Sequence, residues 1–262
     1  MTYLMESPKE GERLLAQESA HSSRSRVVEA GIRKGDRALD AGCGAGAVTA
    51  NLLELVGGEG HVTAFDPSEE RVALARKNLG TAPNLELRVA SLPNPGLAAG
   101  QFDFVWSQFV FEYLENPLGA LESLKALARP GGKVAIAEID GYGLGIWPAS
   151  ERLTSGLELL QRALRAAHFD LFIGRKLFTL FRQLGFRDVG VRLSTFHVTP
   201  GAADDAMLTD WKVRFGALQP LGVQAFGNVE GWNAFTAEYL ETLSNPDALK
   251  YSVVLTTVGT RP

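Results

Sequence analysis

Cysteine is nearly absent from this 262-residue sequence, in which Cys43 stands alone. One cysteine cannot form a disulfide within the chain, and such usage is typical of a reducing compartment, so a cytoplasmic location is expected. Apolar runs long enough to cross a bilayer are missing, as is a basic segment followed by an apolar one, so no membrane partner is expected. Positive charge is not in excess, because 30 acidic residues outnumber 26 basic ones, and this disfavours a nucleic-acid partner.

Glycine, by contrast, is plentiful, and three glycines form a compact loop early in the chain. Residues 38–46 read Ala-Leu-Asp-Ala-Gly-Cys-Gly-Ala-Gly, and a second acid, Asp66, follows twenty residues after Gly46. The order predicts a strand, a tight turn, a helix and a second strand. Glycines let a ligand approach the free N–H groups that open the helix, and an acid at the tip of the second strand can accept both hydroxyls of a ribose. A plain strand–helix turn would need the glycines but not the distant acid, so the pattern predicts a nucleoside site. Cys43, inside the loop, is expected to be a small buried residue and not a nucleophile.

The spacing of the glycines in the loop distinguishes a dinucleotide cofactor from S-adenosylmethionine. Dinucleotide-binding folds use G-x-G-x-x-G, whereas this loop is G-x-G-x-G with Asp40 two residues before it. A carboxylate there would repel a pyrophosphate but suits a ligand that carries an ammonium group. S-adenosylmethionine (SAM) has a ribose for Asp66, an amino group for the region of Asp40, and no phosphate. An NAD(P)-dependent oxidoreductase is the alternative from another class.

With these residues the chain resembles the class I SAM-dependent methyltransferases. The segment 40–46 resembles their motif I, and the resemblance continues through Asp66, 102–107 and 127–132. Within the class, the chain is most similar to the small-molecule branch of ubiquinone/menaquinone and natural-product methyltransferases, with 12–17, 173–177 and 184–186 in support. The resemblance implies methyl transfer from SAM to an oxygen, less often a nitrogen or carbon, of a small, largely apolar organic metabolite. A homodimer is a possible oligomeric state. The second alternative function is a SAM-binding protein that catalyses a reaction other than methylation.

The resemblance also implies which residues bind the cofactor. They come from the ends of four strands and comprise Asp40, Gly42, Gly44, Gly46, Asp66, Pro67, Ser91, Leu92, Ser107 and Gln108. The first four surround the methionine portion, Asp66 binds the ribose, Pro67 flanks the adenine, and the last two approach the methionine end. Ser91 and Leu92 occupy a position where the family often has an acid facing the adenine amino group, and that acid is missing here.

The fold expected from these patterns is α/β, with a doubly wound Rossmann-like sheet of about seven strands and an antiparallel edge hairpin at the C-terminus. Strands are predicted at 36–41, 61–66, 84–89, 102–107, 133–139, 187–198 and 249–259, with a turn at 129–132 before the fifth. We expect a single domain over residues 1–262. Its parts are N-terminal helices (1–34), a cofactor-binding core (35–140) and helical lid segments at 141–169 and 201–245.

The second lid segment, residues 201–245, is rich in aromatic residues. Its aromatic residues are Trp211, Phe215, Phe226, Trp232, Phe235 and Tyr239. Their three-to-four spacing is typical of helix faces packed on a core, although as a set they favour an enclosed apolar pocket. For a hydroxyl acceptor, the candidate general bases are Glu138, Asp140, His168 and His197, of which His168 is selected. No metal is expected.

Overall fold

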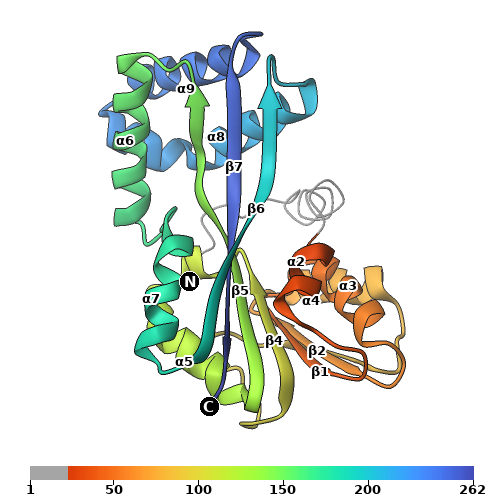
Figure 1. Ribbon diagram of the computed structural model, residues 1–262. Coiled ribbons are helices and arrows are strands. Elements are labelled where there is room, and N and C mark those ends of the chain that lie inside the picture. The colour runs from red at the N-terminus through yellow and green to blue at the C-terminus, as the bar shows by residue number, and fades with distance from the viewer. Residues whose placement is uncertain (1–22) are drawn as a thin grey trace. The chain divides into compact units, whose positions relative to one another are not determined.

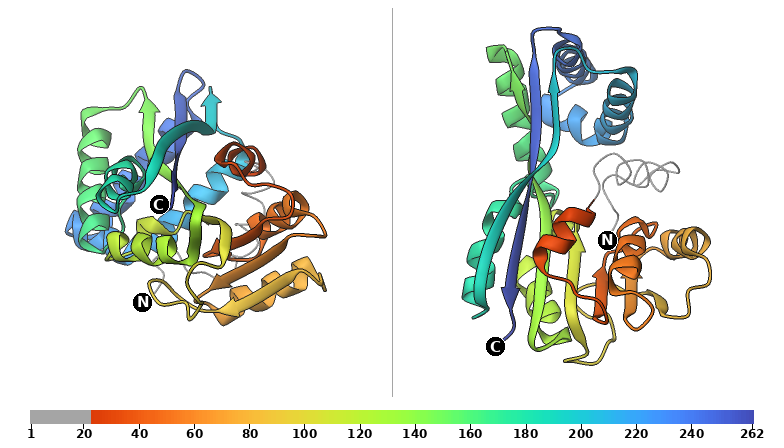
Figure 2. Two further views of the ribbon diagram at one scale, coloured as in Figure 1. Left: turned by 60° about the horizontal axis from the view of Figure 1, so that its bottom comes forward. Right: turned by 45° about the vertical axis from the view of Figure 1, so that its right-hand side comes forward.

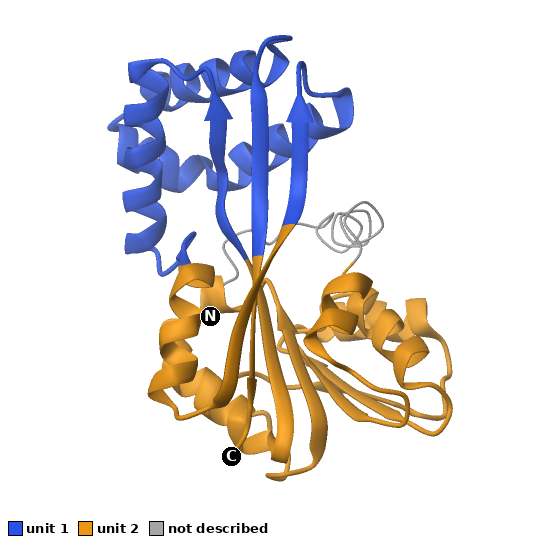
Figure 3. Ribbon diagram, in the orientation of Figure 1, with its two compact units in different colours: residues 1–8, 139–172, 195–254 blue, residues 9–138, 173–194, 255–262 orange. Residues whose placement is uncertain are grey.

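The computed structural model describes residues 23–262 (Figure 1), and these form two compact units (Figure 3). Within the described residues, unit 1 contains 139–172 and 195–254, and unit 2 contains 23–138, 173–194 and 255–262. Of the N-terminal helices predicted for residues 1–34, only α2 (Arg24–Ala30) falls among the described residues. The segment 12–17, which supported the family resemblance, lies outside them.

Seven strands form one sheet in the order β3-β2-β1-β4-β5-β7-β6. They are β1 (Arg37–Ala41), β2 (His61–Asp66), β3 (Leu85–Val89), β4 (Phe102–Gln108), β5 (Ala128–Trp147), β6 (Arg187–Pro200) and β7 (Leu249–Thr260). Strands β1 to β5 pair in parallel, whereas the arrow of β7 runs against its neighbours in Figure 1. The predicted Rossmann-like sheet with antiparallel C-terminal strands is therefore confirmed.

The strand order also positions the helices of unit 2. Besides α2, these are α3 (Ala47–Val56), α4 (Glu69–Leu79), α5 (Pro117–Leu127) and α7 (Ile173–Gln183), and a 3₁₀ turn, η1 (Phe111–Tyr113), follows β4. Because the order reverses between β1 and β4, right-handed crossovers carry α3 and α4 to one face of the sheet and α5 to the other. Figure 2 shows helices on both faces. The central strands are accordingly buried, and they supply Leu39, Phe65 and Val105 to the core.

Helix starts in unit 2 follow the capping signals of the sequence. The Ser68 hydroxyl accepts a hydrogen bond from the Arg71 N–H at the start of α4, and Asn116 accepts one from Gly119 at the start of α5. Both caps satisfy backbone donors that the first helical turn leaves unpaired. These helices therefore begin where local chemistry alone would place them.

The fifth strand was predicted wrongly at both ends. The expected turn at 129–132 is a bulge inside β5, because Phe102 pairs with Ala128 and Phe104 already pairs with Lys133. Gly131, at φ 77°, donates its N–H to the Arg261 carbonyl, so the bulge remains paired. At the other end β5 runs to Trp147 and not to 139. Gly145 lies within the strand, and glycine is required there because a Cβ would come within 2.4 Å of the Tyr251 carbonyl oxygen.

Unit 1 has a core of its own. It consists of α6 (Glu151–Ala166), α8 (Asp205–Phe226) and α9 (Val229–Ser244), together with the adjoining parts of β5, β6 and β7. The helices predicted within 141–169 and 201–245 are thus present, although 141–147 is strand. Leucines of α6 pack with Trp211, Phe215 and Trp232 in one hydrophobic cluster.

Candidate functional site

The glycine loop joins β1 to α3 and has a backbone that favours glycine at three positions. Gly42, Gly44 and Gly46 have φ values of 87°, 52° and 88°, in the left-handed region that side chains disfavour. Space is restricted as well: a Cβ on Gly42 would lie 2.3 Å from Cγ2 of Val110, and one on Gly46 would lie 2.9 Å from Cδ1 of Leu79. The loop is therefore held from behind by packed side chains, and α3 begins immediately after it at Ala47.

Asp66 ends β2, and its carboxylate is fixed by the backbone. Its Oδ2 accepts a hydrogen bond from the Gly44 N–H and its Oδ1 accepts one from the Ser68 N–H, each at 3.0 Å. A carboxylate oxygen can accept more than one hydrogen bond. This arrangement fits the two adjacent hydroxyls of a ribose, and it ties the acid to the middle glycine of the loop.

Asp40 lies in β1, is 2% exposed and has a buried donor. The Thr49 hydroxyl, one turn into α3, donates to Oδ2 of Asp40 at 2.7 Å. Two buried carboxylates thus flank the loop, and their effect is visible on Cys43. Burial raises the pKa of the Cys43 thiol, and the charges of Asp40 and Asp66 raise it further. The thiol stays protonated, as expected of a buried residue that is not a nucleophile, and the local potential suits a cation better than a phosphate.

The remaining residues predicted to bind cofactor lie in different settings. Ser107 is completely buried, and its hydroxyl donates to the Ala41 carbonyl at 2.8 Å, which fastens β4 to the end of β1 beside the loop. The side-chain oxygen of Gln108 accepts a bond from Arg26 at 3.4 Å. Pro67 and Ser91 are exposed, whereas Leu92 packs against the core of unit 2. Their roles toward the cofactor stay predictions.

Among the candidate bases, the histidines and Glu138 have contrasting environments. His168 is exposed and follows α6 with φ 60°, and its N–H donates to the Arg165 carbonyl as the helix ends. His197, in β6, packs its ring edge-on against Tyr142 at 6.0 Å. Glu138 is fully buried at the end of the unit 2 part of β5, and Asp140 is partly exposed. The choice of His168 as base remains a prediction.

Three residues that contact or influence the site residues were not predicted from the sequence: Thr49, Val110 and Glu112. Thr49 and Val110 act through single contacts to residues distant in the chain, and no spacing rule connects them to the loop. Glu112, in η1, is 8% exposed and bears on the ionisation of Glu138. The burial of Glu112 after a central strand, and with it its effect on Glu138, can be recognised only once the fold is known.

The aromatic residues of unit 1 pack mainly on one another. Trp211 stacks on Tyr142 with ring centroids 5.3 Å apart, and the Tyr239 hydroxyl donates to the Gly143 carbonyl at 2.9 Å. Arg214 lies over the Tyr142 ring at 4.7 Å. Buried aromatic side chains in this arrangement are core packing, as their helical spacing indicates. Closure of the two predicted lid segments over an acceptor stays a prediction.

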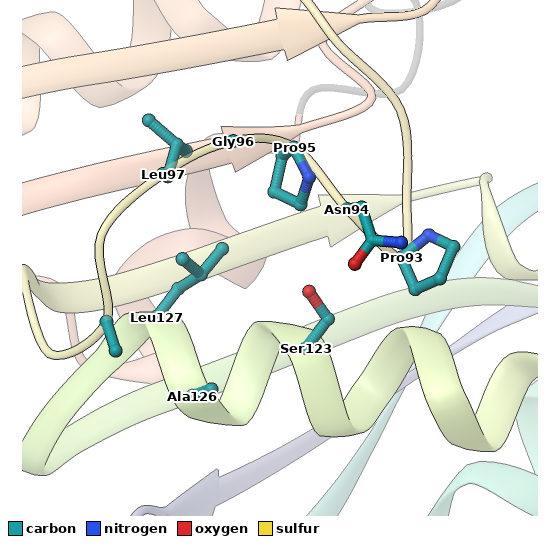
Figure 4. Close-up of a pocket in the computed structure, with 9 residues that line it drawn as sticks. Pro93, Asn94, Pro95, Gly96, Leu97, Ser123, Ala126 and Leu127 are labelled. Carbon is teal, nitrogen blue, oxygen red and sulfur yellow. The ribbon is translucent and has the colours of Figure 1, made fainter.

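A cavity of about 320 Å³ lies in unit 2 between the loop after β3 and α5 (Figure 4). It is lined by Pro93, Asn94, Pro95, Gly96, Leu97, Ala99, Ser123, Ala126 and Leu127. None of these side chains is ionisable, so the cavity offers no acid–base chemistry. Across residues 23–262, no helix combines the length and apolar character needed to cross a membrane. The same residues contain no group of three or more histidine, cysteine and acidic side chains placed to hold a metal ion.

A doubly wound sheet, a left-handed G-x-G-x-G loop preceded by Asp40 and an acid at the tip of the second strand are the features expected of the class I SAM-dependent methyltransferases. Residues 39–136 match a family described as a methyltransferase domain, and this segment includes Asp40, the glycine loop and Asp66. Residues 39–136 of this chain therefore form a methyltransferase domain, and the fold and the loop agree with the class I SAM-dependent type. SAM is its cofactor, as the loop spacing predicted.

Curated relatives match part of the chain. A 37.1 kDa uncharacterized protein of Streptomyces fradiae is 30% identical over 136 residues, which are 52% of this chain and 39% of that protein. An uncharacterized methyltransferase of Schizosaccharomyces pombe is 31% identical over 125 residues, or 45% of each chain. The chain thus spans less than half the length of these two relatives. A demethylmenaquinone methyltransferase of Staphylococcus epidermidis is 26% identical over 176 residues, 63% of this chain and 73% of that enzyme.

Solved structures share the fold at low identity. A SAM-dependent methyltransferase of Aquifex aeolicus has a TM-score of 0.55 and 24% identity, and the match covers 72% of this chain and 92% of that one. Phosphoethanolamine N-methyltransferase 2 of Haemonchus contortus, solved with SAM, has a TM-score of 0.60 and 14% identity over all of this chain and 60% of that one. At these identities the likeness concerns the fold.

Proposed function

We propose that the protein is an enzyme that transfers the methyl group of SAM to an oxygen atom of a small, largely apolar organic metabolite. The observation that carries the proposal is the position of the Asp66 carboxylate at the end of β2, where the N–H groups of Gly44 and Ser68 fix it beside the glycine loop, as a ribose-binding acid requires. The curated relatives named for demethylmenaquinone favour a small-molecule acceptor over a macromolecule. The net charge of −4 agrees with that preference.

The residues of the loop perform binding and orientation. Asp66 holds the ribose, the glycine loop admits the methionine portion close to the backbone, and Asp40 supplies negative charge on the side of the amino group. Bound SAM supplies an activated methyl group. What remains for the protein is to align the acceptor and exclude water, and proximity of this kind contributes roughly 7–11 kcal/mol.

An oxygen acceptor also has to lose a proton. A positioned base adds about 10²–10⁴-fold in rate, which is less than alignment provides. His168 is the base that we propose. Replacing it with Gln should lower turnover and leave the affinity for SAM unchanged, because only the removal of the acceptor's proton depends on the base. Equal turnover of both proteins across pH 6–9 would remove His168 from the mechanism.

Two measurements test the proposal in sequence. Calorimetry with SAM and with S-adenosylhomocysteine should give binding heat and a raised melting temperature, whereas NADH should give neither. Heat with NADH alone would favour the oxidoreductase alternative. Incubation with methyl-labelled SAM and a metabolite extract should then yield a labelled product whose label sits on oxygen. Cofactor binding with no labelled product from any extract would favour a SAM-binding protein with a different reaction.

We also propose that 141–169 and 201–245 cover the acceptor. In support, α6, α8 and α9 share one hydrophobic cluster, so these segments are built to act together. Amide hydrogen exchange in them should slow more than in β1–β4 when S-adenosylhomocysteine and acceptor are bound. The same exchange with and without both ligands would show that these segments are not a lid.

A further inference from the structure

Glu138 combines complete burial with an incomplete set of hydrogen bonds. It lies in β5, and its side chain is inaccessible to solvent. Its Oε1 accepts bonds from the N–H of Val110 at 2.9 Å and the N–H of Phe111 at 2.8 Å. Its Oε2 is buried without a hydrogen-bond partner among the described residues. A buried carboxylate in such a place would carry an uncompensated charge, which is costly.

The surroundings favour the protonated acid. Burial raises the pKa of Glu138 well above its ordinary value, and the nearby charge of Glu112 raises it further, against the opposing effect of backbone N–H donors. From α7, Gly174 faces Glu138 and brings no ionisable group. Burial and the charge of Glu112 therefore favour the protonated form of Glu138, whose Oε1 accepts two backbone N–H groups.

The backbone that Glu138 holds is the turn after β4. Phe109 has φ 56°, an unfavourable value for an aromatic residue, and its N–H donates to the Ala137 carbonyl at 3.0 Å. The next two N–H groups, of Val110 and Phe111, are those bound by Glu138. A strained turn persists only where its surroundings fix it, and here three consecutive N–H groups are fixed by the end of β5.

This turn is in direct contact with the cofactor loop. The Val110 side chain lies behind Gly42, so close that an added Cβ would be 2.3 Å from its Cγ2. A displacement of Val110 would therefore change the support of the loop that binds the methionine portion. Glu138 in β5, Val110 in the turn after β4 and Gly42 in the loop after β1 form a continuous set of contacts.

We infer that Glu138 is a positioning residue for cofactor binding. Its side-chain oxygen holds the turn 109–111 so that Val110 supports Gly42 in the shape that accepts SAM. The inference rests on the proposed function, since it takes the glycine loop to be the cofactor site of a working enzyme. The residue acts through Val110 and not by touching the substrate.

Three variants separate positioning from general stability. Glu138→Gln keeps a neutral acceptor of the same shape, so its dissociation constant for S-adenosylhomocysteine should stay within about threefold of wild type. Glu138→Leu keeps the volume but removes the acceptor, and binding should weaken at least about tenfold, the effect of losing about 1.4 kcal/mol. Val134→Ala, in the same strand and also buried, is the control that lowers the melting temperature but leaves the dissociation constant unchanged.

The outcomes are distinct. Wild-type affinity in Glu138→Leu would overturn the inference, as would an equal loss of affinity in Val134→Ala. Tenfold weaker binding by Glu138→Gln would overturn the role of a neutral acceptor. If Glu138→Leu does not fold, Glu138→Asp replaces it, because its shorter side chain cannot reach both N–H groups, and it should also bind at least about tenfold more weakly. Absence of binding by the wild type would instead count against the proposed function.

Discussion

Replacing Asp66 with Ala should weaken cofactor binding far more than any change at Asp103, another acid that is bonded to backbone. In Asp66→Ala, a bound ribose would lose two hydrogen bonds to a charged acceptor, each worth roughly 1.5–3 kcal/mol. Together these amount to about 3–6 kcal/mol, or a dissociation constant raised about 10²–10⁴-fold. The backbone N–H groups of Gly44 and Ser68 would lose their acceptor as well, so some loss of stability should accompany the change.

Asp103 provides the matched control. It accepts a hydrogen bond from the Arg37 N–H at 2.9 Å and forms an ion pair with Arg129. Burial alone would raise its pKa, but these two partners lower it. Arg37 begins β1, Asp103 lies at the start of β4 and Arg129 at the start of β5, all at the opposite strand ends from the loop, so Asp103→Ala should lower the melting temperature and leave cofactor affinity intact.

Calorimetric titration with S-adenosylhomocysteine decides between the two acids, with circular dichroism to verify the fold. Asp66→Asn adds a finer test, because the amide retains one acceptor oxygen but presents its NH₂ to one of the two N–H donors. Its affinity should fall between wild type and Asp66→Ala. A folded Asp66→Ala protein that binds within threefold of wild type would refute the ribose assignment.

Three further predictions concern other buried polar groups. Thr49→Val removes the hydroxyl that donates to Asp40 and should weaken cofactor binding about tenfold, whereas Thr49→Ser should restore it; equal affinity for all three would disconnect Asp40 from the cofactor. Lys250→Met removes the ammonium that donates to the Leu243 carbonyl at 2.9 Å, and it should destabilise unit 1 by about 1–3 kcal/mol with cofactor affinity unchanged; exchange and calorimetry would measure both, and a weakened affinity would contradict it. The raised pKa of Glu138 means that the folded protein binds this proton more tightly than the unfolded chain. Its stabilising effect is therefore complete below the ordinary value near 4.5 and is lost as pH rises toward the folded pKa. The melting temperature of wild type should fall relative to Glu138→Gln as pH rises from 5 to 8, and parallel curves would show an ionised Glu138.

The loop was predictable because its constraints are local. Left-handed backbone at Gly42 and Gly46 requires a residue without a side chain, and an acid after β2 is a fixed distance along the chain. The same holds for helix starts at Ser68 and Asn116, where one side chain caps its own helix. The cofactor and most boundaries of helices and strands could therefore be predicted from the spacing of residues along the chain.

The support of the loop was not predictable because it depends on residues far apart in sequence. Val110 lies 68 positions from Gly42, and nothing in either neighbourhood indicates that they touch. The extended β5 was missed for a related reason. Gly141, Gly143 and Gly145 resemble a break, yet close approach of a neighbouring element is what requires glycine at Gly145.

Three buried carboxyl groups near the loop divide into two kinds by their hydrogen bonds. Asp66 receives one donor on each oxygen, and Asp40 receives the Thr49 hydroxyl, so their negative charge is stabilised where it faces the loop. Glu138 is completely buried, has an oxygen without a donor among the described residues and lies near Glu112, so its pKa is raised and its neutral form is favoured. The potential at the loop is then set by the two aspartates, which suits a cofactor with an ammonium and a sulfonium. In its protonated form Glu138 adds no charge there, so it can shape the loop through Val110 without changing that potential, and this is why a neutral glutamine should replace it.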